Sequence, residues 1–245
     1  MKNVKCKMKS GRFAAGFLLS AFSFLLCLMP KAGAQDAAAG ESLFDGRALG
    51  KWKSIQFGGE GDVSVEDGAI IMGAGNDMTG VTWTGKLPRI DYELTLEGKR
   101  IDGLDFFCTT TFPVADRPCS LVVGGWSGSV VGLSNIDGYD ASDNPTMRLK
   151  SFKKNQWYRV RIRVTKAKIE AWIDDEKLVD QEAAGHKFSI RSECDPCRPL
   201  GIATWQTKGA VRNIRLHSLT AEEVAKIAAA KPEPKGPVTE KRDSR

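Results

Sequence analysis

The feature that most constrains the fold is a stretch in which apolar and charged residues alternate. From Tyr158 to Val164, apolar side chains occupy every second position and arginines lie between them, and the segment from Ile169 to Ile173 continues the pattern. A period of two is typical of a half-buried β-strand, because successive side chains point to opposite faces of the sheet. Two such strands, joined by a turn at Lys166 and Ala167, predict an antiparallel hairpin.

The register of this hairpin predicts which side chains are buried. Pairing Val164 with Ile169 places these side chains on the core face: Val160, Ile162, Val164, Ile169 and Ile173. The same register exposes these side chains on the other face: Arg159, Arg161, Arg163 and Glu170. There, Arg163 opposes Glu170, Arg161 opposes Trp172, and Arg159 opposes Asp174. Exposed cross-strand pairs stabilise a sheet by roughly 0.2–1 kcal/mol each. We interpret this face as solvated surface rather than as a binding site.

Short apolar segments separated by turn residues make up most of the remaining chain. An Asp67-Gly68 turn predicts a hairpin over residues 63–72. We expect the other strands at residues 81–84, 92–96, 104–107, 121–123, 130–133, 147–152, 177–181, 200–205 and 211–219. No helix fits the segment from 103 to 146. Roughly ten to thirteen strands without an internal repeat predict a single all-β domain of two packed sheets.

The two ends of the chain differ in composition from this domain. Basic residues precede an apolar run from Phe13 to Met29, and Ala32-Gly33-Ala34 then supplies a cleavage site, so residues 1–34 are predicted to be a signal peptide. We expect a linker at residues 35–40 and the domain at residues 41–219. At residues 220–245, a capping box of Thr220 and Glu223 predicts a short helix, and a charged, Pro-containing tail follows.

Export with cleavage is one of three fates that such a leader allows. A membrane anchor is disfavoured because the apolar run contains Gly and Ser and is followed at once by small residues. A lipoprotein is disfavoured because large residues, Phe24 to Leu26, precede Cys27. We therefore expect a mature protein that begins at Gln35, has no integral membrane segment, and is secreted, periplasmic or in the cell envelope.

Removing the leader makes the chain electrically neutral. Six of the 36 Lys and Arg residues lie in residues 1–34, which contain no acidic residue, so the remaining 30 balance the 30 Asp and Glu. This balance gives no electrostatic reason to bind nucleic acid or an anionic membrane. The chain also lacks a glycine-rich phosphate loop, G-x-S-x-G and H-E-x-x-H. We expect a monomer whose partner is a small, neutral molecule.

Four of the six cysteines lie in the predicted mature chain, and export would allow them to form disulfides. Of the three possible pairings, we favour the local one, which joins Cys108 to Cys119 and Cys194 to Cys197, because it closes short loops. A zinc site built from all four cysteines and a redox role for the C-x-x-C motif are the alternatives. Both are weaker, because a second closely spaced pair and a surrounding βαβ pattern are missing.

The segment from 103 to 146 contains the densest set of candidate functional residues. Glycines at 124, 125, 128, 132 and 138 leave Trp126 and Tyr139 among small neighbours, as in a platform on which a sugar ring stacks. The alternative is that these glycines mark bulges and tight bends, and that Trp126 belongs partly to the core.

Several motifs in order along the chain resemble the 3-keto-disaccharide hydrolase domain family. They are LFDG-x-x-L-x-x-W from Leu43, DYELTLE from Asp91, NQWYRVRIRV from Asn155, AWIDDEKLVD from Ala171, and LGIATWQT with VRNIRLHSL at the end. The resemblance covers residues 41–219. It implies a concanavalin-A-like jelly roll, related in fold to lectins and glucanases, in an exported protein that acts on oxidised glycosides. Commoner members read N-S-G-[VI]-F-F-R and E-x-Q-[IV]-x-D where this chain has Gly103 to Cys108 and Ser120 to Trp126, so it resembles a divergent subgroup.

The resemblance implies cleavage of the glycosidic bond of a 3-keto-glycoside. A ketone at C3 acidifies the proton on C2, so a carboxylate can remove that proton and the resulting enolate can expel the substituent on C1. The candidate catalytic residues are Asp105, Asp137 and Asp140, with Asp143 as a further base or metal ligand. The candidate substrate-binding residues are Trp126, Tyr139, Asn144, Arg148 and Trp205. The same four aspartates are also candidate ligands of a divalent metal, and the sequence requires no cofactor.

Two other functions fit the same sequence. A non-catalytic carbohydrate-binding or adhesion module would stack sugars on Trp126, Tyr139 and Trp205, and a structural envelope protein would need no concave aromatic site. Convergence of carboxylates and aromatic rings in a pocket favours the enzyme, whereas a flat aromatic strip favours the binding module. We expect these residues to surround one concavity: Asp105, Trp126, Asp137, Tyr139, Asp140 and Asn144.

Overall fold

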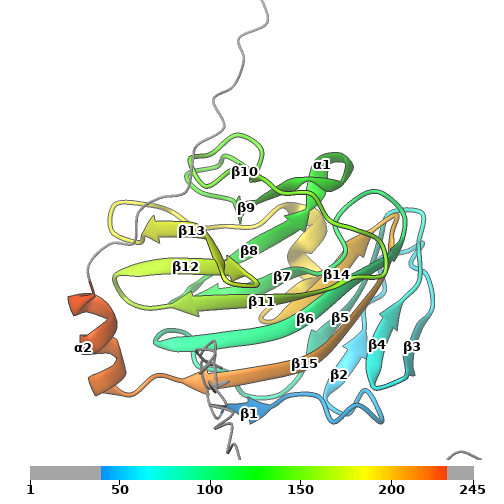
Figure 1. Ribbon diagram of the computed structural model, residues 1–245, viewed down its shortest axis with the longest axis horizontal. Coiled ribbons are helices and arrows are strands. Elements are labelled where there is room, and N and C mark those ends of the chain that lie inside the picture. Colours follow the sequence, from blue (N-terminus) through cyan, green and yellow to red (C-terminus); the bar gives the residue numbers. More distant parts are fainter. Residues whose placement is uncertain (1–39, 231–245) are drawn as a thin grey trace, which may run out of the picture. The chain divides into compact units, whose positions relative to one another are not determined.

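The computed structural model describes residues 40–230, and their strands form two antiparallel sheets (Figure 1). The eight-stranded sheet has the order β13-β12-β11-β6-β15-β4-β3, with β1 paired to β15, and the seven-stranded sheet has the order β10-β9-β8-β7-β14-β5-β2. The first sheet contains β1 (Glu41–Ser42), β3 (Val63–Glu66), β4 (Ala69–Met72), β6 (Tyr92–Asp102), β11 (Trp157–Val164), β12 (Lys168–Ile173), β13 (Glu176–Glu182) and β15 (Lys208–Ser218). The second contains β2 (Trp52–Ser54), β5 (Met78–Trp83), β7 (Thr109–Val114), β8 (Arg117–Gly124), β9 (Val130–Ser134), β10 (Arg148–Leu149) and β14 (Gly201–Trp205). The predicted all-β jelly roll is confirmed.

Three short helices complete the described residues. They are α1 (Gly125–Gly128), the 3-10 helix η1 (Ser192–Cys197) and α2 (Ala221–Ala229). The predicted capping box of α2 is confirmed, since Glu223 N donates to Thr220 Oγ1 (3.2 Å) and Thr220 N donates to Glu223 Oε2 (2.7 Å). None of the helices in residues 40–230 has the length and apolar character needed to cross a bilayer. The predicted signal peptide, the linker up to residue 39 and the tail from residue 231 lie outside the described residues.

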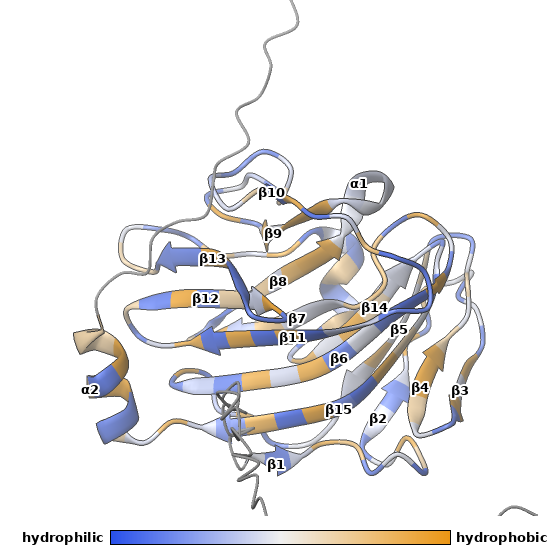
Figure 2. Ribbon diagram, in the orientation of Figure 1, coloured by the Kyte–Doolittle hydropathy of each residue, from blue (hydrophilic) through white to orange (hydrophobic). Residues whose placement is uncertain are grey.

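The core lies between the two sheets and is filled by alternate residues of their strands. Figure 2 shows hydrophobic and hydrophilic bands alternating along β6, β11 and β15. From these strands Leu94, Ile162 and Ile214 are fully buried, and they share one cluster with Leu121 and Ile202 of the opposite sheet. Fully burying side chains of this size stabilises the fold by roughly 1.5–3 kcal/mol each. The period of two therefore accounts for both sheets.

The hairpin of β11 and β12 has the predicted register, with Val164 opposite Ile169 and Ile162 opposite Ala171. Its five predicted core residues are buried. The prediction that Glu170 is exposed is wrong, because only 2% of this residue is accessible. Its carboxylate accepts from Lys177 Nζ (2.7 Å) and lies 3.3 Å from Arg163 Nη1. Long basic side chains from adjacent strands cover it, since their apolar stems lie along the sheet.

The neighbouring arginines also differ from the prediction. Arg163 bridges Glu170 and Glu93 of β6 and is half-buried, and the Arg161 guanidinium lies 3.9 Å from the centroid of the Trp172 ring. Arg159 is exposed, as predicted, but its side chain pairs with Asp175 (2.5 Å) rather than with Asp174. This face is a packed layer of ion pairs and cation–π contacts rather than a freely solvated surface.

Two predicted strands are absent or shortened, and both lie beside the site described below. Residues 104–107 form a bend rather than a strand, because Gly103 has φ +92° and turns the chain so that Phe107 enters the core. The strand predicted at residues 147–152 is reduced to the two residues of β10. A short turn, α1, forms between β8 and β9, where no helix was expected.

Candidate functional site

A cavity of about 200 Å³ lies on the face of the seven-stranded sheet that points away from the core. Its floor includes Ser120 and Val122 of β8, which alternate with the core residues Leu121 and Val123 and therefore project to the opposite side. The residues that line it are Asp105, Phe106, Thr109, Ser120, Val122, Trp126, Ser134, Arg191, Glu193, Cys194 and Trp205. The bend at 103–107, α1 and η1 form its walls.

The α1 turn holds Trp126 at the rim of this cavity in an unusual backbone conformation. Trp126 (φ 47°, ψ 67°) and Ser127 (φ 65°, ψ 28°) are both left-handed, and Gly124 and Gly128 on either side also have positive φ. Each non-glycine residue in this region costs on the order of 1–3 kcal/mol, and such strain is concentrated at functional sites. Trp126 as a residue is 39% exposed, so part of this large aromatic side chain is open to a ligand.

Asp105 fastens the α1 turn to the bend before β7. Its Oδ2 accepts from Ser127 N (3.1 Å), its Oδ1 accepts from Phe106 N (2.8 Å), and its own amide donates to Thr207 Oγ1 (3.1 Å). A carboxylate fixed by two backbone donors is rigid, but each oxygen keeps a free lone pair. Asp105 can therefore position Trp126 and also accept a hydrogen bond from a ligand in the cavity.

Arg191 and Glu193 line the cavity from the start of η1. Arg191 Nη2 donates to Glu193 Oε1 (2.9 Å), and Arg191 Nη1 donates to Asp140 Oδ2 (3.0 Å). The pKa of Glu193 is lowered by a hydrogen bond from its own backbone amide and by Arg191, while the bond to Glu193 raises the pKa of Arg191. Glu193 is therefore a carboxylate at neutral pH, with a cation beside it.

Aromatic rings and hydroxyl groups complete the cavity. Phe106 and Trp205 are in contact, with ring centroids 6.3 Å apart and an interplanar angle of 48°. The Ser120 hydroxyl, which also lines the cavity, shares a buried hydrogen bond of 2.8 Å with the Thr111 hydroxyl. Burial raises the pKa of the Cys194 thiol to about 11, so this thiol is protonated and a poor nucleophile at neutral pH. Rings for stacking, carboxylates and hydroxyls are the groups that recognise a sugar.

Comparison with known families agrees with a cavity whose side chains can recognise a sugar. Residues 39–217 match the family described as the 3-keto-alpha-glucoside-1,2-lyase-like domain. The chain belongs to this family. It is the family that the sequence motifs resemble, and the match extends across both sheets.

Comparison with solved structures gives the fold of this lyase-like domain alone. A Crh5 transglycosylase in complex with NAG aligns with a TM-score of 0.54 at 14% identity, over 75% of this chain and 86% of that one. The carbohydrate-binding module CBM66 from Bacillus subtilis aligns with a TM-score of 0.45 at 11% identity, over 69% of this chain and 96% of that one. No curated protein matches the sequence significantly.

The lyase-like domain brings together some of the candidates predicted from its sequence. Asp105, Trp126 and Trp205 line the cavity, and Asp140 contacts it indirectly through Arg191. The predicted convergence of all six residues of the central stretch is therefore only partly met. Asp137, Tyr139, Asn144 and Arg148 do not line this cavity.

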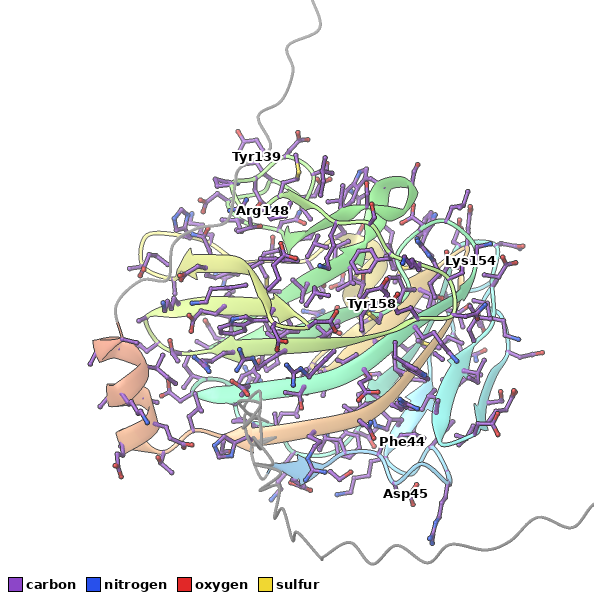
Figure 3. All side chains as sticks on the ribbon, in the orientation of Figure 1. Phe44, Asp45, Tyr139, Arg148, Lys154 and Tyr158 are labelled. Carbon is purple, nitrogen blue, oxygen red and sulfur yellow. The ribbon has the colours of Figure 1, made fainter. Side chains whose placement is uncertain are left out.

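The other candidates have contacts of their own. Asp137 accepts from Lys187 N (2.8 Å) and lies 2.7 Å from His186 Nδ1. The bond from the Lys187 amide, and then the one with His186, lower the pKa of Asp137. Asp143 is exposed. Asn144 is buried and donates to the carbonyls of Leu133 and Asp140 (2.7 Å each), so it supports the loop. Tyr139 lies at the outer edge of that loop, with Arg148 below it in the view of Figure 3. Arg148 donates to the Met147 carbonyl (2.7 Å).

The structure contains neither of the predicted disulfides, since all four cysteines in the described residues are free and buried. The β7–β8 register places Cys119 opposite Phe112, so Cys108 lies about 13 Å further along the ladder, beyond the roughly 7 Å that a disulfide spans. Cys108 instead packs against Gly98 of the other sheet. Cys194 and Cys197 share the η1 turn as thiols.

The positions of the four cysteines also test the alternative prediction of a zinc site. Within residues 40–230, no group of three or more His, Cys, Asp or Glu side chains is arranged to hold a metal ion. A zinc site made by all four cysteines is therefore not formed, because Cys108 and Cys119 point into the core while Cys194 and Cys197 lie on the opposite face of the seven-stranded sheet.

Sequence reasoning missed Arg191 and Glu193, which form an entire wall of the cavity. They lie in an irregular segment without periodicity, and more than eighty residues separate them from Asp105. The one available signal for these two residues was a charged Arg-x-Glu directly before the C-x-x-C motif. The C-x-x-C motif itself was interpreted as a disulfide, with metal and redox sites as alternatives. Only the packing of η1 against β5 and β14 places these charges in the cavity that Trp126 also lines.

Proposed function

We propose that this protein is an exported enzyme that cleaves the glycosidic bond of 3-keto-glycosides by elimination. The observation that carries the proposal is the convergence of two carboxylates, Asp105 and Glu193, with Arg191 and Trp126 around one cavity. Membership of a family described as lyase-like supports the reaction class. A flat aromatic strip would instead have favoured a binding module.

The chemistry requires a base near C2 and positive charge near the ketone oxygen. The base takes the C2 proton, the C–H electron pair forms the enolate, and the enolate then forms a C1–C2 double bond as the C1–O bond breaks. The departing oxygen takes up a proton, and water can add to the unsaturated product afterwards. The ketone already present at C3 makes the C2 proton acidic, so the elimination needs no oxidant or reductant.

Glu193 is the better base of the two carboxylates. Both Asp105 oxygens accept amides of other residues, whereas the side-chain bond to Glu193 Oε2 is that from Ser192 Oγ (3.2 Å). The Glu193 backbone amide and Arg191 lower the pKa of Glu193, so its carboxylate is ionised and can take a proton. Arg191 retains N–H groups beyond those directed at Glu193 and Asp140, so it can stabilise the developing enolate. Trp126 offers a face for the sugar ring, and Asp105 orients Trp126 and the sugar hydroxyls.

The decisive experiment follows release of the leaving group from 3-keto-disaccharides by residues 35–245, with and without divalent metal. Glu193→Gln should lower the rate on the order of a hundredfold or more, the usual scale of general-base catalysis, while binding persists. Asp137→Asn is the matched control, because that carboxylate lies outside the cavity. The corresponding disaccharides without the ketone should not react, because their C2 proton is not acidic.

The same experiment tests the alternative function, a non-catalytic carbohydrate-binding module. If no carboxylate substitution changes any turnover while Trp126→Ala abolishes sugar binding, the enzymatic proposal is wrong. Exposed aromatic rings and a carboxylate fixed by backbone amides would then serve recognition alone.

A further inference from the structure

We infer that this cavity selects uncharged sugars over acidic ones, and that Asp140 is a residue that determines this specificity. The inference rests on the proposed function, because it names the class of sugar that the same site accepts. A glucuronide, which carries a carboxylate at C6, represents the sugars that the cavity would reject.

The charged side chains that line the cavity are mostly acidic. Among its eleven lining residues, Asp105 and Glu193 carry carboxylates, and Arg191 carries the one guanidinium. The lining therefore presents two formal negative charges against one positive charge. Like charges brought together across a binding surface suppress the binding of the wrong partner. A sugar that brings its own carboxylate meets such repulsion here, whereas a neutral sugar does not.

The Arg191 guanidinium is already shared between two carboxylates. Its Nε (3.3 Å) and Nη2 (2.9 Å) both donate to Glu193 Oε1, and its Nη1 donates to Asp140 Oδ2 (3.0 Å). A guanidinium has five N–H donors, so some hydrogen-bonding capacity remains, but it has one positive charge. A neutral hydroxyl or ketone oxygen can accept a remaining N–H group. The carboxylate of an acidic sugar would be a third anion around this cation.

Asp140 is fixed in place before a ligand arrives. Its Oδ1 accepts from both the amide (3.0 Å) and the hydroxyl (2.7 Å) of Ser142, which leaves Oδ2 for Arg191. Asn144 Nδ2 donates to the Asp140 carbonyl (2.7 Å), which holds the backbone as well. The Asp140 side chain is 21% exposed, so salt and water screen its charge only in part. Asp140 does not line the cavity, and it acts on a ligand through Arg191.

Two further cations near the cavity do not offset this balance. Arg198 pairs with Asp195 within η1 (3.2 Å). Arg100 approaches α1, since a β-carbon added at Gly128 would lie 2.7 Å from its Nη1. It is 6% exposed, donates to the Phe152 carbonyl (2.6 Å) and does not line the cavity. The strands that pack against η1, β5 and β14, contain no charged residue.

The same charge balance is compatible with the elimination. When Glu193 takes the C2 proton it becomes neutral, and the negative charge moves to the enolate. The net charge of the cavity therefore does not change during this step. An acidic sugar instead adds a charge that the reaction does not remove.

Methyl 3-keto-α-glucoside and its C6 carboxylate, methyl 3-keto-α-glucuronide, test the inference because they are nearly equal in size. In the wild-type protein at pH 7 and low salt, KM for the glucuronide should be at least about tenfold higher. Added salt should reduce this ratio of KM values, because it screens the repulsion. Asp140→Asn, whose side-chain carbonyl can still accept from Ser142, should reduce the ratio several-fold, because one carboxylate beside Arg191 becomes neutral.

Asp143→Asn is the matched control, because it removes the same charge from an exposed position of the same loop that does not line the cavity. This variant should keep the wild-type ratio of KM values. An equal decrease in both variants would show an effect of overall charge and would count against Asp140.

The outcomes separate this inference from the proposed function. Equal KM values for the two glycosides, or a ratio that Asp140→Asn leaves unchanged, would overturn the inference while leaving the enzyme intact. If neither glycoside is cleaved, the proposed function fails, and calorimetric dissociation constants decide the specificity. A tenfold preference for the glucoside that depends on Asp140 then supports the inference, and equal values refute it. If neither glycoside binds, both proposals are wrong.

Discussion

At the scale of single residues, the site depends on Trp126, whose backbone has a left-handed conformation that tryptophan rarely adopts. Left-handed backbone at Trp126 and Ser127 persists because Asp105 accepts from the Ser127 amide and because the flanking glycines turn without strain. The glycines and the exposed aromatic ring could be predicted from the sequence. The sequence indicated Asp105, the carboxylate that fixes them, only as a base or a metal ligand, because its partner amide lies more than twenty residues away.

Replacing Trp126 by alanine should weaken sugar binding roughly 10–100-fold, the scale of a lost stacking contact, with little loss of fold stability. Isothermal titration with a 3-keto-glucoside measures the change. Tyr139→Ala is the control, since Tyr139 is more exposed than Trp126 but does not line the cavity. Equal losses in the two variants would show that the binding surface extends to the Tyr139 loop.

At the scale of elements, the outer face of β6, β11, β12 and β13 shows how neighbouring strands change the environment of a residue. The pairing of Arg163 with Glu170 follows from the alternation in one hairpin. The burial of Glu170 does not, because it requires Lys177 from β13 and an arginine that is shared with Glu93 of β6. A hairpin considered alone predicts register but not the depth to which a side chain is covered.

The ion pairs of Glu170 predict a pH-dependent contribution to stability. Burial would raise the pKa of Glu170, but Lys177 and Lys168 outweigh burial and lower it below the ordinary 4.5. A lowered folded-state pKa stabilises the fold above the unfolded-state pKa, and that stabilisation is lost as the pH falls through the folded-state pKa. Glu170→Gln should therefore cost about 2 kcal/mol at pH 7 and flatten the loss of stability below about pH 4.5.

Urea denaturation of the Glu170→Gln variant at a series of pH values measures both effects. Glu176→Gln is the matched control, because Glu176 pairs with Lys150 while remaining 60% exposed. Exposed pairs of this kind contribute little, so its stability should stay within about 0.5 kcal/mol of wild type. A pH profile for Glu170→Gln that runs parallel to wild type would show that Glu170 does not titrate as described.

The cysteines give a second prediction for an element, the hairpin of β7 and β8. In folded, unreduced protein, peptide mapping should find no link between Cys108 and Cys119, since the register holds them about 13 Å apart. All four thiols should resist alkylation until the protein is denatured, because all are buried. A Cys108–Cys119 peptide recovered from active protein would contradict this register.

At the scale of the whole molecule, export and processing remain predictions from the sequence. The mature protein should begin at Gln35, because Ala32-Gly33-Ala34 directly follows the apolar run of the leader. Intact-mass measurement of protein recovered from the periplasm or culture medium tests this. Recovery of full-length protein with residues 1–34 still attached would instead support a membrane anchor.

Local patterns in the sequence predicted the features that depend on neighbours along the chain. Period-two alternation predicted the strands and the inward-facing residues, the turn at Lys166 and Ala167 predicted the register of β11 with β12, and the capping box predicted α2. Ordered motifs predicted the family and with it the jelly roll. Each of these signals depends on local geometry, in which spacing along the chain sets direction in space.

Which residues share the cavity depends on how distant strands pack, and no pattern in the sequence predicted it. Asp105 and Trp126 come from one stretch of sequence, but Glu193 and Arg191 reach them only because β14 pairs with both β5 and β7, which places η1 over the same sheet. The same packing left Asp137 and Tyr139 outside and kept Cys108 apart from Cys119. Contacts between distant strands depend on sheet order, and no local spacing in a sequence specifies that order.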